Sequence, residues 1–145
     1  MRIIDLLRKK GSAVATVPPN ATVSEVITAL VEHRVGALIV SPDGASISGI
    51  VSERDVVRGL HERGAAVLGE PVTTLMTTAV RTCRAADDID SLTLIMTEHR
   101  IRHVPVVDAD GRLDGIVSIG DVVKKRIDEL ENEREALVDY ITTGR

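Results

Sequence analysis

Residues 49–58 read Gly-Ile-Val-Ser-Glu-Arg-Asp-Val-Val-Arg, and residues 115–124 read Gly-Ile-Val-Ser-Ile-Gly-Asp-Val-Val-Lys. The offset between them is 66 residues, and the same offset carries Glu-His-Arg at 32–34 onto Glu-His-Arg at 98–100. Separate matches in one register indicate a tandem duplication, a feature that fixes the architecture. Two copies predict a module with pseudo-two-fold symmetry and two equivalent clefts.

The size and composition of the chain favour one globular unit. A copy of about 60 residues would be only marginally stable alone, so we expect the halves of this 145-residue chain to be interlocked. Aromatic residues make up only 1% of the sequence, with Tyr140 the single example, so the core must be aliphatic. The lack of aromatic side chains argues against stacking on nucleic-acid bases. A net charge of −4 without a long basic run argues against binding a phosphate backbone.

Several kinds of site and location are disfavoured by the sequence. No apolar run reaches the roughly 18 residues that a membrane span needs, and Arg8, Lys9 and Lys10 interrupt any signal-peptide core. The single cysteine, Cys83, is expected to be a buried strand residue, with a redox role as the less favoured alternative. A reducing cytoplasm is therefore the expected location. The four histidines lack metal-ligand spacing and no nucleophile motif is present, so neither a metal site nor catalysis is expected.

Turn, capping and periodicity signals predict helix, strand, helix, strand, strand, helix in each copy. Thr22 with Glu25 predicts a capping box, and Gly11 and Gly64 predict helix ends. The expected fold class is α+β, a sandwich of the α/β type, with repeat 1 at 1–66, repeat 2 at 67–133, and the end of the last helix and the tail at 134–145. The predicted helices are 2–9, about 22–34, 53–63, 72–76, 89–100 and about 121–141, and the predicted strands are 13–17, 37–40, 46–52, 79–83, 103–107 and 113–118.

The repeated motif places a serine at a strand end and an aspartate three residues later, at a helix start. The pairs are Ser52 with Asp55 and Ser118 with Asp121. One interpretation is structural, because Ser-x-x-Asp caps a helix. The other is functional, because a carboxylate presents two acceptor oxygens that match the cis-diol of a ribose, and a helix N-terminus favours a nearby phosphate. The two interpretations are compatible.

These features resemble a known family. The order of elements and the repeated Gly-Ile-Val-Ser-x-x-Asp are similar to a tandem pair of cystathionine β-synthase (CBS) domains, the Bateman module. Residues 52–58, 100–106 and 118–124, and a last helix ending in Tyr140-Ile141, resemble a subgroup of stand-alone CBS-pair proteins from bacteria and plant organelles. The resemblance covers nearly the whole chain. It implies a regulatory sensor that binds AMP, ADP, ATP, NAD or S-adenosylmethionine between the repeats.

Position by position, the resemblance implies one cleft built around the second copy. Ser118 and Asp121 would hold the ribose, and Ile116 would flank the adenine. Arg102 and His103 match positions that meet phosphate in related modules. The facing wall would come from the first copy, through Ala13, Val14, Ala15 and Val35.

The resemblance implies a second cleft around the first copy. Its ribose and adenine contacts would be Ile50, Ser52, Asp55 and Val80. Gly36 and Ala37 stand in the places of the basic pair, so Arg54 and Arg58 are expected to bind phosphate here. A solvated helix face is the alternative for these two arginines. We therefore expect the two clefts to bind unequally.

The last predicted helix carries apolar residues at alternating spacings of three and four. They are Val123, Ile127, Leu130, Leu137 and Ile141, with Arg134 at the remaining place. This heptad stripe predicts either packing on the chain's own core or a seam between two copies. The resemblance favours a homodimer.

The favoured function is a non-enzymatic sensor that binds AMP, ATP or NAD and acts on a separate partner protein, in signalling, redox or energy metabolism. The plant members suggest redox enzymes of the thioredoxin type, or other metabolic enzymes, as partners. The alternatives are a structural dimerisation module with vestigial clefts, an NAD-using enzyme and a nucleic-acid binder. No catalytic cofactor is expected, because the chain has no Rossmann glycine fingerprint and no acid–base set.

Overall fold

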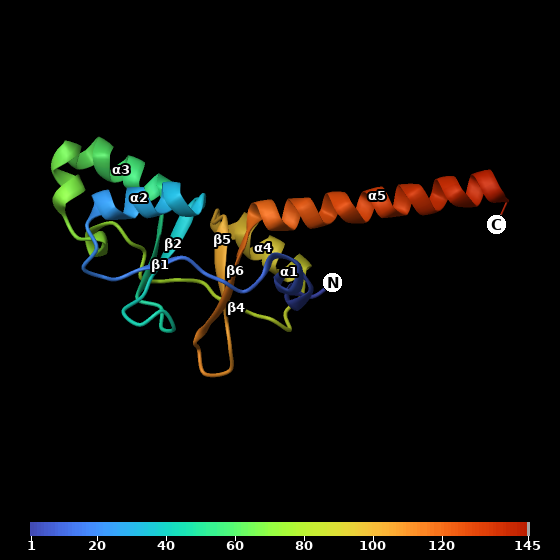
Figure 1. Cartoon of the computed structure of the whole chain (residues 1–145), viewed down its shortest axis with the longest axis horizontal. Coiled ribbons are helices and arrows are strands. Elements are labelled where there is room, and N and C mark those ends of the chain that lie inside the picture. The colour runs from blue at the N-terminus through green and yellow to red at the C-terminus, as the bar shows by residue number, and fades with distance from the viewer. Residues whose placement is uncertain (145) are drawn as a thin grey trace.

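The computed structural model describes residues 1–144 and contains two three-stranded sheets, one in each copy (Figure 1). In both sheets the first strand runs parallel to the second, and the second runs antiparallel to the third. The predicted α+β class with two repeated halves is therefore confirmed, while Arg145 of the predicted tail lies outside the described residues. The strands are β1 (Thr16–Val17), β2 (Ala37–Val40), β3 (Gly49–Ser52), β4 (Cys83–Arg84), β5 (His103–Val107) and β6 (Leu113–Ser118).

Helices connect and cover the strands, and their ends follow local chemistry. The helices are α1 (Ile3–Lys10), α2 (Val23–His33), α3 (Glu53–Arg63), α4 (Ile89–His99) and α5 (Ile119–Thr143), with short 3-10 segments at Gly64–Gly69 and Val72–Thr74. Thr22 Oγ1 accepts a hydrogen bond from the Glu25 N–H at 3.2 Å, which forms the Thr22 half of the predicted capping box. Gly11 and Gly64 follow the last residues of α1 and α3, as predicted.

Two predicted strands are much shorter in the structure. Of residues 13–17 only the last two form β1, and of residues 79–83 only Cys83 belongs to β4. The chain before each of these strands crosses from one half to the other, so it does not extend its own sheet. Thr77 shows the crossing, since it exchanges backbone hydrogen bonds of 2.9 and 3.0 Å with Ile50 of the other copy.

Two other boundaries also differ from the prediction. The strand predicted at 46–52 begins at Gly49, because the Asp43 carboxylate accepts hydrogen bonds from the backbone N–H groups of Ala45 and Ser46 and holds a loop there. The helix predicted at 72–76 is a single 3-10 turn, Val72–Thr74.

The halves are interlocked through exchanged N-terminal segments. Helix α1 precedes the first sheet, yet its apolar residues Ile3, Leu6 and Leu7 are buried in the core of the second copy, with at most 5% of each exposed. Val72 precedes the second sheet and is fully buried in the core of the first copy. Each core therefore includes side chains from both copies, which is the interlocking expected from the small size of one copy.

The glycine that opens each repeated motif makes room for these exchanged segments. A Cβ on Gly115 would lie 2.8 Å from Leu7 Cδ2 of α1. A Cβ on Gly49 would lie 2.8 Å from both the Met76 sulfur and the Thr77 carbonyl oxygen. The motif glycine is thus required by the close approach of the opposite copy.

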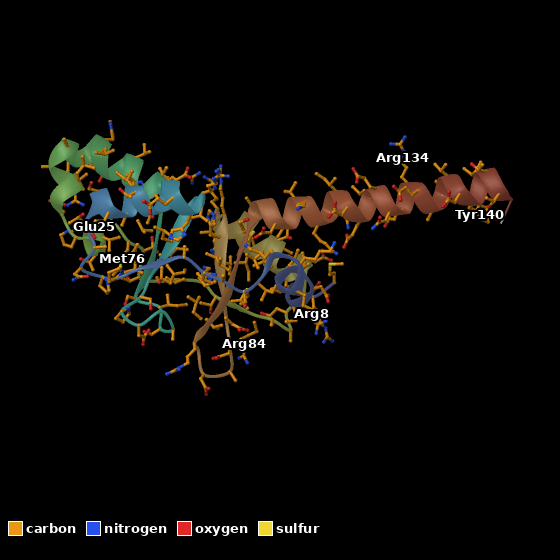
Figure 2. The ribbon with its side chains drawn as sticks, viewed as in Figure 1. Arg8, Glu25, Met76, Arg84, Arg134 and Tyr140 are labelled. Carbon is orange, nitrogen blue, oxygen red and sulfur yellow. The ribbon has the colours of Figure 1, made fainter. Side chains whose placement is uncertain are left out.

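Helix α5 extends far beyond the rest of the molecule (Figure 1), and Figure 2 shows Arg134 and Tyr140 on this projecting part. The stripe residues Val123, Ile127 and Leu130 are about half exposed, and Leu137 and Ile141 are 60% and 71% exposed. The stripe therefore does not pack on the chain's own core, which removes one of its two interpretations. Over residues 1–144, no helix combines the length and apolar character that crossing a bilayer would require.

Candidate functional site between the two copies

The Ser-x-x-Asp motif forms the same corner in both copies, where β3 meets α3 and β6 meets α5. Asp55 Oδ2 accepts hydrogen bonds from Ser52 N at 2.9 Å and Ser52 Oγ at 3.0 Å, and Asp55 N donates to Ser52 Oγ at 3.3 Å. Asp121 Oδ2 likewise accepts from Ser118 N at 2.9 Å, and Asp121 N donates to Ser118 Oγ at 3.2 Å. The capping interpretation of the motif is confirmed.

The cap uses only one carboxylate oxygen of Asp55. Oδ2 is occupied by Ser52, whereas Oδ1 lies 3.8 Å from Arg58 Nη1. The Asp55 side chain is 16% exposed and lines a cleft. A carboxylate oxygen has two acceptor sites, and Oδ1 alone can therefore accept both hydroxyls of a diol while Oδ2 holds the helix cap.

A cleft of about 780 Å³ opens beside Asp55, and we call it the Asp55 cleft. Its volume lies within the range typical of small-molecule sites, roughly 300–1,000 Å³. Both copies contribute to its walls, so a ligand here would contact the two halves at once. The lining residues are Gly36, Ala37, Ile50, Ser52, Glu53, Arg54, Asp55, Val57, Arg58, Thr77, Ala79, Val80, Arg81, His99, Arg100, Ile101, Arg102 and His103.

Positive charge dominates the Asp55 cleft. Arg54 and Arg58 come from the first copy, and Arg81, Arg100 and Arg102 come from the second. The acidic side chains on the same walls are Glu53 and Asp55. Five guanidinium groups around one concave site favour an anion, and guanidinium binds phosphate in a bidentate way.

The structure brings together six of the residues assigned to this cleft from the sequence: Ile50, Ser52, Arg54, Asp55, Arg58 and Val80. It also places Arg102 and His103 on the same walls, although the sequence assigned them to the cleft of the second copy. His103 contacts both copies, because its backbone pairs in register with Ser118 of the second copy and its ring packs against Gly36 of the first. His103 therefore stands at the boundary between the two corners.

The pKa of His103 lies below its ordinary value in this position. Burial lowers the pKa of the imidazole below its ordinary value, and the nearby charge of Lys10 lowers it further. Asp121 and Glu53 act in the opposite direction, but the net shift is downward. The ring is thus suited to donating and accepting hydrogen bonds, and the arginines supply the positive charge of the cleft.

The Asp121 corner differs from the Asp55 cleft because Lys10 occupies it. Lys10 Nζ donates to Asp121 Oδ2 at 2.6 Å and to the Ile116 carbonyl oxygen at 2.9 Å. Burial raises the pKa of Asp121, but hydrogen bonds from Lys10 and Ser118 outweigh it and hold the pKa below its ordinary value. The carboxylate stays ionised and paired.

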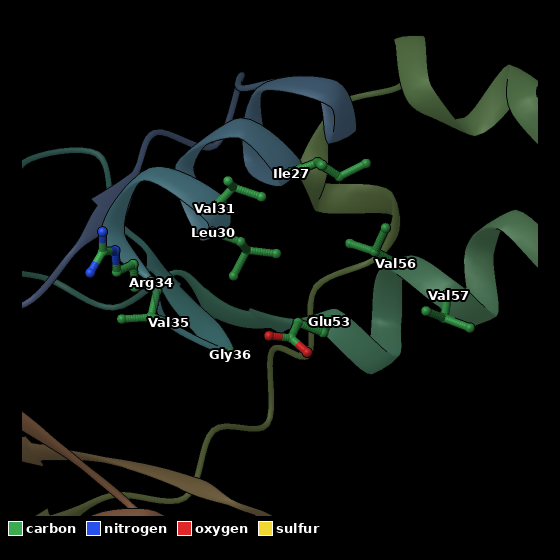
Figure 3. Close-up of a pocket in the computed structure, with 9 residues that line it drawn as sticks. All are labelled: Ile27, Leu30, Val31, Arg34, Val35, Gly36, Glu53, Val56 and Val57. Atoms are coloured by element: carbon green, nitrogen blue, oxygen red, sulfur yellow. The ribbon is translucent and has the colours of Figure 1, made fainter.

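The assignment of Ala13, Val14, Ala15 and Val35 to the wall that faces Asp121 stays a prediction. Ala15 and Val35 pack against the core of the first copy, Ala13 is exposed and Val14 is half-buried. Val35 also lines an apolar groove of about 450 Å³ between α2 and α3 (Figure 3). The other residues that line this groove are Ile27, Leu30, Val31, Arg34, Gly36, Glu53, Val56 and Val57.

Two parts of the site were not predicted from the sequence. Arg81 and Arg100 line the cleft, and each adjoins a stretch already assigned, since Arg81 follows Val80 and Arg100 precedes the basic pair. Lys10 was also missed as a site residue. The signal for it was an irregularity in the repeat, because the first copy carries three extra residues at 10–12 that the second copy lacks.

Cys83 and the potential metal ligands offer no second site. The Cys83 thiol is 4% exposed, lies 3.6 Å from the Pro105 carbonyl oxygen, and has a pKa raised to about 12, first by burial and then by the charge of Asp87. A thiol so protonated and buried is unreactive. Among residues 1–144, no three His, Cys, Asp or Glu side chains are grouped to hold a metal ion.

Comparison with known proteins places this geometry in context. The family model described as "CBS domain" matches the chain twice, at residues 4–62 and 72–128. The mitochondrial CBS domain-containing protein CBSX3 of Arabidopsis thaliana is 31% identical over 150 residues, covering 98% of this chain and 72% of that protein. The crystal structure of a CBS-domain protein from Agrobacterium tumefaciens has a TM-score of 0.84 and 43% identity, covering 87% of this chain and 99% of the other. A CBS domain protein from Pyrobaculum aerophilum, solved as a complex with AMP, has a TM-score of 0.73 and 31% identity, covering 83% and 89%.

Proposed function

Because the chain belongs to the CBS-domain family and contains two copies of that domain, we propose that it is a regulatory module that binds an adenine nucleotide in the Asp55 cleft. The observation that carries the proposal is the combination, in one cleft, of a carboxylate oxygen free of the helix cap and five arginines. The carboxylate suits the ribose hydroxyls, and the arginines suit the phosphates. The relative that binds AMP supports the adenosine part of this assignment.

The charge of the cleft favours some adenosine ligands over others. S-adenosylmethionine carries a sulfonium cation, and five arginines would oppose it. AMP brings one phosphate, whereas ADP, ATP and NAD bring two or more and can engage more of the guanidinium groups. We therefore rank the nucleotides with several phosphates above AMP, and AMP above S-adenosylmethionine.

Regulation follows from the position of the cleft between the two copies. A ligand that contacts Asp55 on one half and Arg102 on the other favours the arrangement that holds these residues together. Binding would thereby shift the population of arrangements of the two halves, and a separate partner protein would respond to the favoured one. The ligand is the signal in this scheme and is not consumed.

The exposed stripe on α5 supports a further part of the proposal, a homodimer. Residues 123–141 keep the heptad spacing of a two-stranded coiled coil, and the stripe stays uncovered along the projecting helix. We assign the stripe to a second copy of this chain. Light scattering should give a dimer for the native protein and a monomer for Leu130→Asp, whereas a monomeric native protein would refute the assignment.

A thermal-shift panel tests the nucleotide proposal directly. The panel comprises AMP, ADP, ATP, NAD and S-adenosylmethionine, with adenine, GMP and GTP as controls for the sugar and the base. A ligand at 100 times its dissociation constant should stabilise the protein by about 2.7 kcal/mol. Stabilisation by nucleotides that contain both adenine and phosphate supports the proposal. A folded protein that responds to none of them would leave the structural dimerisation module as the better reading.

A turnover assay distinguishes the regulatory module from an enzyme. NADH, NAD or ATP incubated with the protein should be recovered unchanged at long times, as followed by absorbance and by chromatography of the nucleotide. Steady consumption that scales with protein concentration would contradict a purely regulatory role.

A further inference from the structure

Lys10 stands at the C-terminal end of α1 and reaches across to the second copy. Its ammonium group donates to the Asp121 carboxylate at 2.6 Å and to the Ile116 carbonyl at 2.9 Å. The lysine and aspartate side chains are 31% and 24% exposed, so the pair is partly shielded from water. Asp121 and Ile116 are the positions equivalent to Asp55 and Ile50 of the open cleft.

The Ile50 carbonyl, which is equivalent to that of Ile116, has a different hydrogen-bond partner. The Ile50 carbonyl accepts a hydrogen bond from the backbone N–H of Thr77, in the segment that crosses from the second copy. The Ile116 carbonyl instead accepts a side-chain ammonium. The Asp55 carboxylate meets Arg58 at 3.8 Å, a longer contact than the one at Asp121, and Arg58 is 58% exposed against 31% for Lys10.

The repeat itself explains this difference. The two copies align at an offset of 66 residues from Ala13 onwards but at 69 residues over helix α1, so residues 10–12 have no counterpart in the second copy. Lys10 is the first of the three extra residues, and in the second copy the chain passes directly to Ala79, which lines the open cleft. One insertion thus supplies an amine to one corner and leaves the other corner without one.

We propose that Lys10 acts as an internal cation that closes the Asp121 corner, so that each chain binds one nucleotide and not two. This inference rests on the proposed function and assigns the single open site to Asp55. Lys10 binds the Ile116 carbonyl oxygen and the capping oxygen Oδ2 of Asp121, so its ammonium group stands in the corner and neutralises the carboxylate that a ribose would need. Because α1 is anchored by backbone hydrogen bonds from Ile3 and Ile4 to the second copy, the ammonium group is always close to Asp121 and competes at high effective concentration.

A ligand can enter the Asp121 corner only in the fraction of molecules in which Lys10 has moved away. The apparent dissociation constant at that corner is therefore the intrinsic constant divided by this fraction. Removing the amine removes the competition and leaves the Ser118–Asp121 cap intact. The number of nucleotides bound per chain is the quantity that changes.

Calorimetric titration with ADP measures that number. Native protein and Lys9→Met should bind one ADP per chain, because Lys9 lies on the same helix end and is exposed. Lys10→Met should bind two, and the double variant Lys10→Met/Asp121→Asn should return to one. This last variant shows that the added site is the Asp121 corner.

The outcomes separate the inference from the proposed function. Two sites in the native protein, or one site in a folded Lys10→Met variant, would overturn the closure by Lys10 while leaving nucleotide binding in place. Absence of binding by every variant would overturn both. A measurement free of nucleotide adds a direct check: mass spectrometry after brief acetylation should find Lys10 modified at least several-fold more slowly than Lys9, and equal rates would contradict the ion pair of Lys10 with Asp121.

Discussion

Replacing Asp55 by alanine should abolish discrimination between a ribonucleotide and its 2′-deoxy analogue. In the structure Asp55 Oδ2 is held by Ser52, and Oδ1 is left to accept the ribose hydroxyls. The native protein should therefore bind ADP more tightly than 2′-deoxy-ADP. Asp55→Ala has no oxygen in this position, and both nucleotides should then bind with the same weak affinity.

The magnitude follows from the number of hydrogen bonds lost. A hydrogen bond to a charged group contributes about 1.5–3 kcal/mol, so loss of the 2′-hydroxyl alone should weaken native binding by about tenfold to a hundredfold. Loss of both hydroxyl contacts in Asp55→Ala amounts to about 3 kcal/mol or more, or roughly 150-fold at least. Native protein and Asp55→Ala, each with ADP and with 2′-deoxy-ADP, form a thermodynamic cycle. Its coupling energy, the interaction of Asp55 with the 2′-hydroxyl, should be about 1.5–3 kcal/mol.

Calorimetry with ADP and 2′-deoxy-ADP gives the four dissociation constants, and Asp121→Ala is the matched control. Both substitutions remove a Ser-x-x-Asp cap, so both should destabilise the fold by about 1 kcal/mol in urea denaturation. Only Asp55→Ala should weaken the binding of ADP. A coupling energy near zero, or an equal loss of affinity in the control, would show that Asp55 serves only as a helix cap.

Three further predictions concern the backbone, the core and pH. Arg34 and Arg100 both end their helices in the left-handed region, with φ of 54° and 53°, so glycine should be tolerated or should stabilise the fold by up to about 1 kcal/mol at either position. Only Arg100→Gly should weaken ADP binding, because Arg100 lines the Asp55 cleft. An equal loss of ADP affinity in Arg34→Gly would contradict the assigned cleft. Gly115→Val should destabilise the fold by about 1–3 kcal/mol in urea denaturation because its Cβ meets α1 at 2.8 Å, and a neutral result would show that α1 moves freely. The Asp121 pKa is lowered on folding, so the stability that Lys10 and the cap contribute is present above the unfolded pKa of about 3.9 and is lost as pH falls through the lower folded value. In thermal melts between pH 5 and pH 2, Lys10→Met should therefore lose less stability on acidification than the native protein. An unchanged pH profile would refute the ion pair.

Local patterns predicted the helices and the central strands well. The helix at Val23–His33 and the strands at Ala37–Val40 and His103–Val107 are set by periodicity, capping and turn residues within a few positions of each other. The strands at 13–17 and 79–83 were predicted too long, because their neighbouring segments bind to the opposite copy. Such pairing between distant parts of the chain leaves no local signal.

The sequence predicted many of the residues that form the candidate site, but not how the two copies are placed around it. The repeat correctly identified Asp55 and Asp121 as equivalent corners, because the motif that caps a helix is local. It could not show which half faces which corner, so Arg102 was assigned to one cleft and lies on the wall of the other. Lys10 belongs to neither repeat pattern, and the packing of α1 on the second copy brings it to Asp121.

The exchange of N-terminal segments has a consequence for biosynthesis. As the chain leaves the ribosome, the apolar face of α1 is made about a hundred residues before its partners Val104 and Val117. During that interval the nascent chain carries an unburied aliphatic surface, and the first sheet also waits for Val72. Neither half can finish folding while its counterpart is missing, so products that lack one copy should be recognised and degraded, and the two copies together should unfold and refold as one cooperative unit.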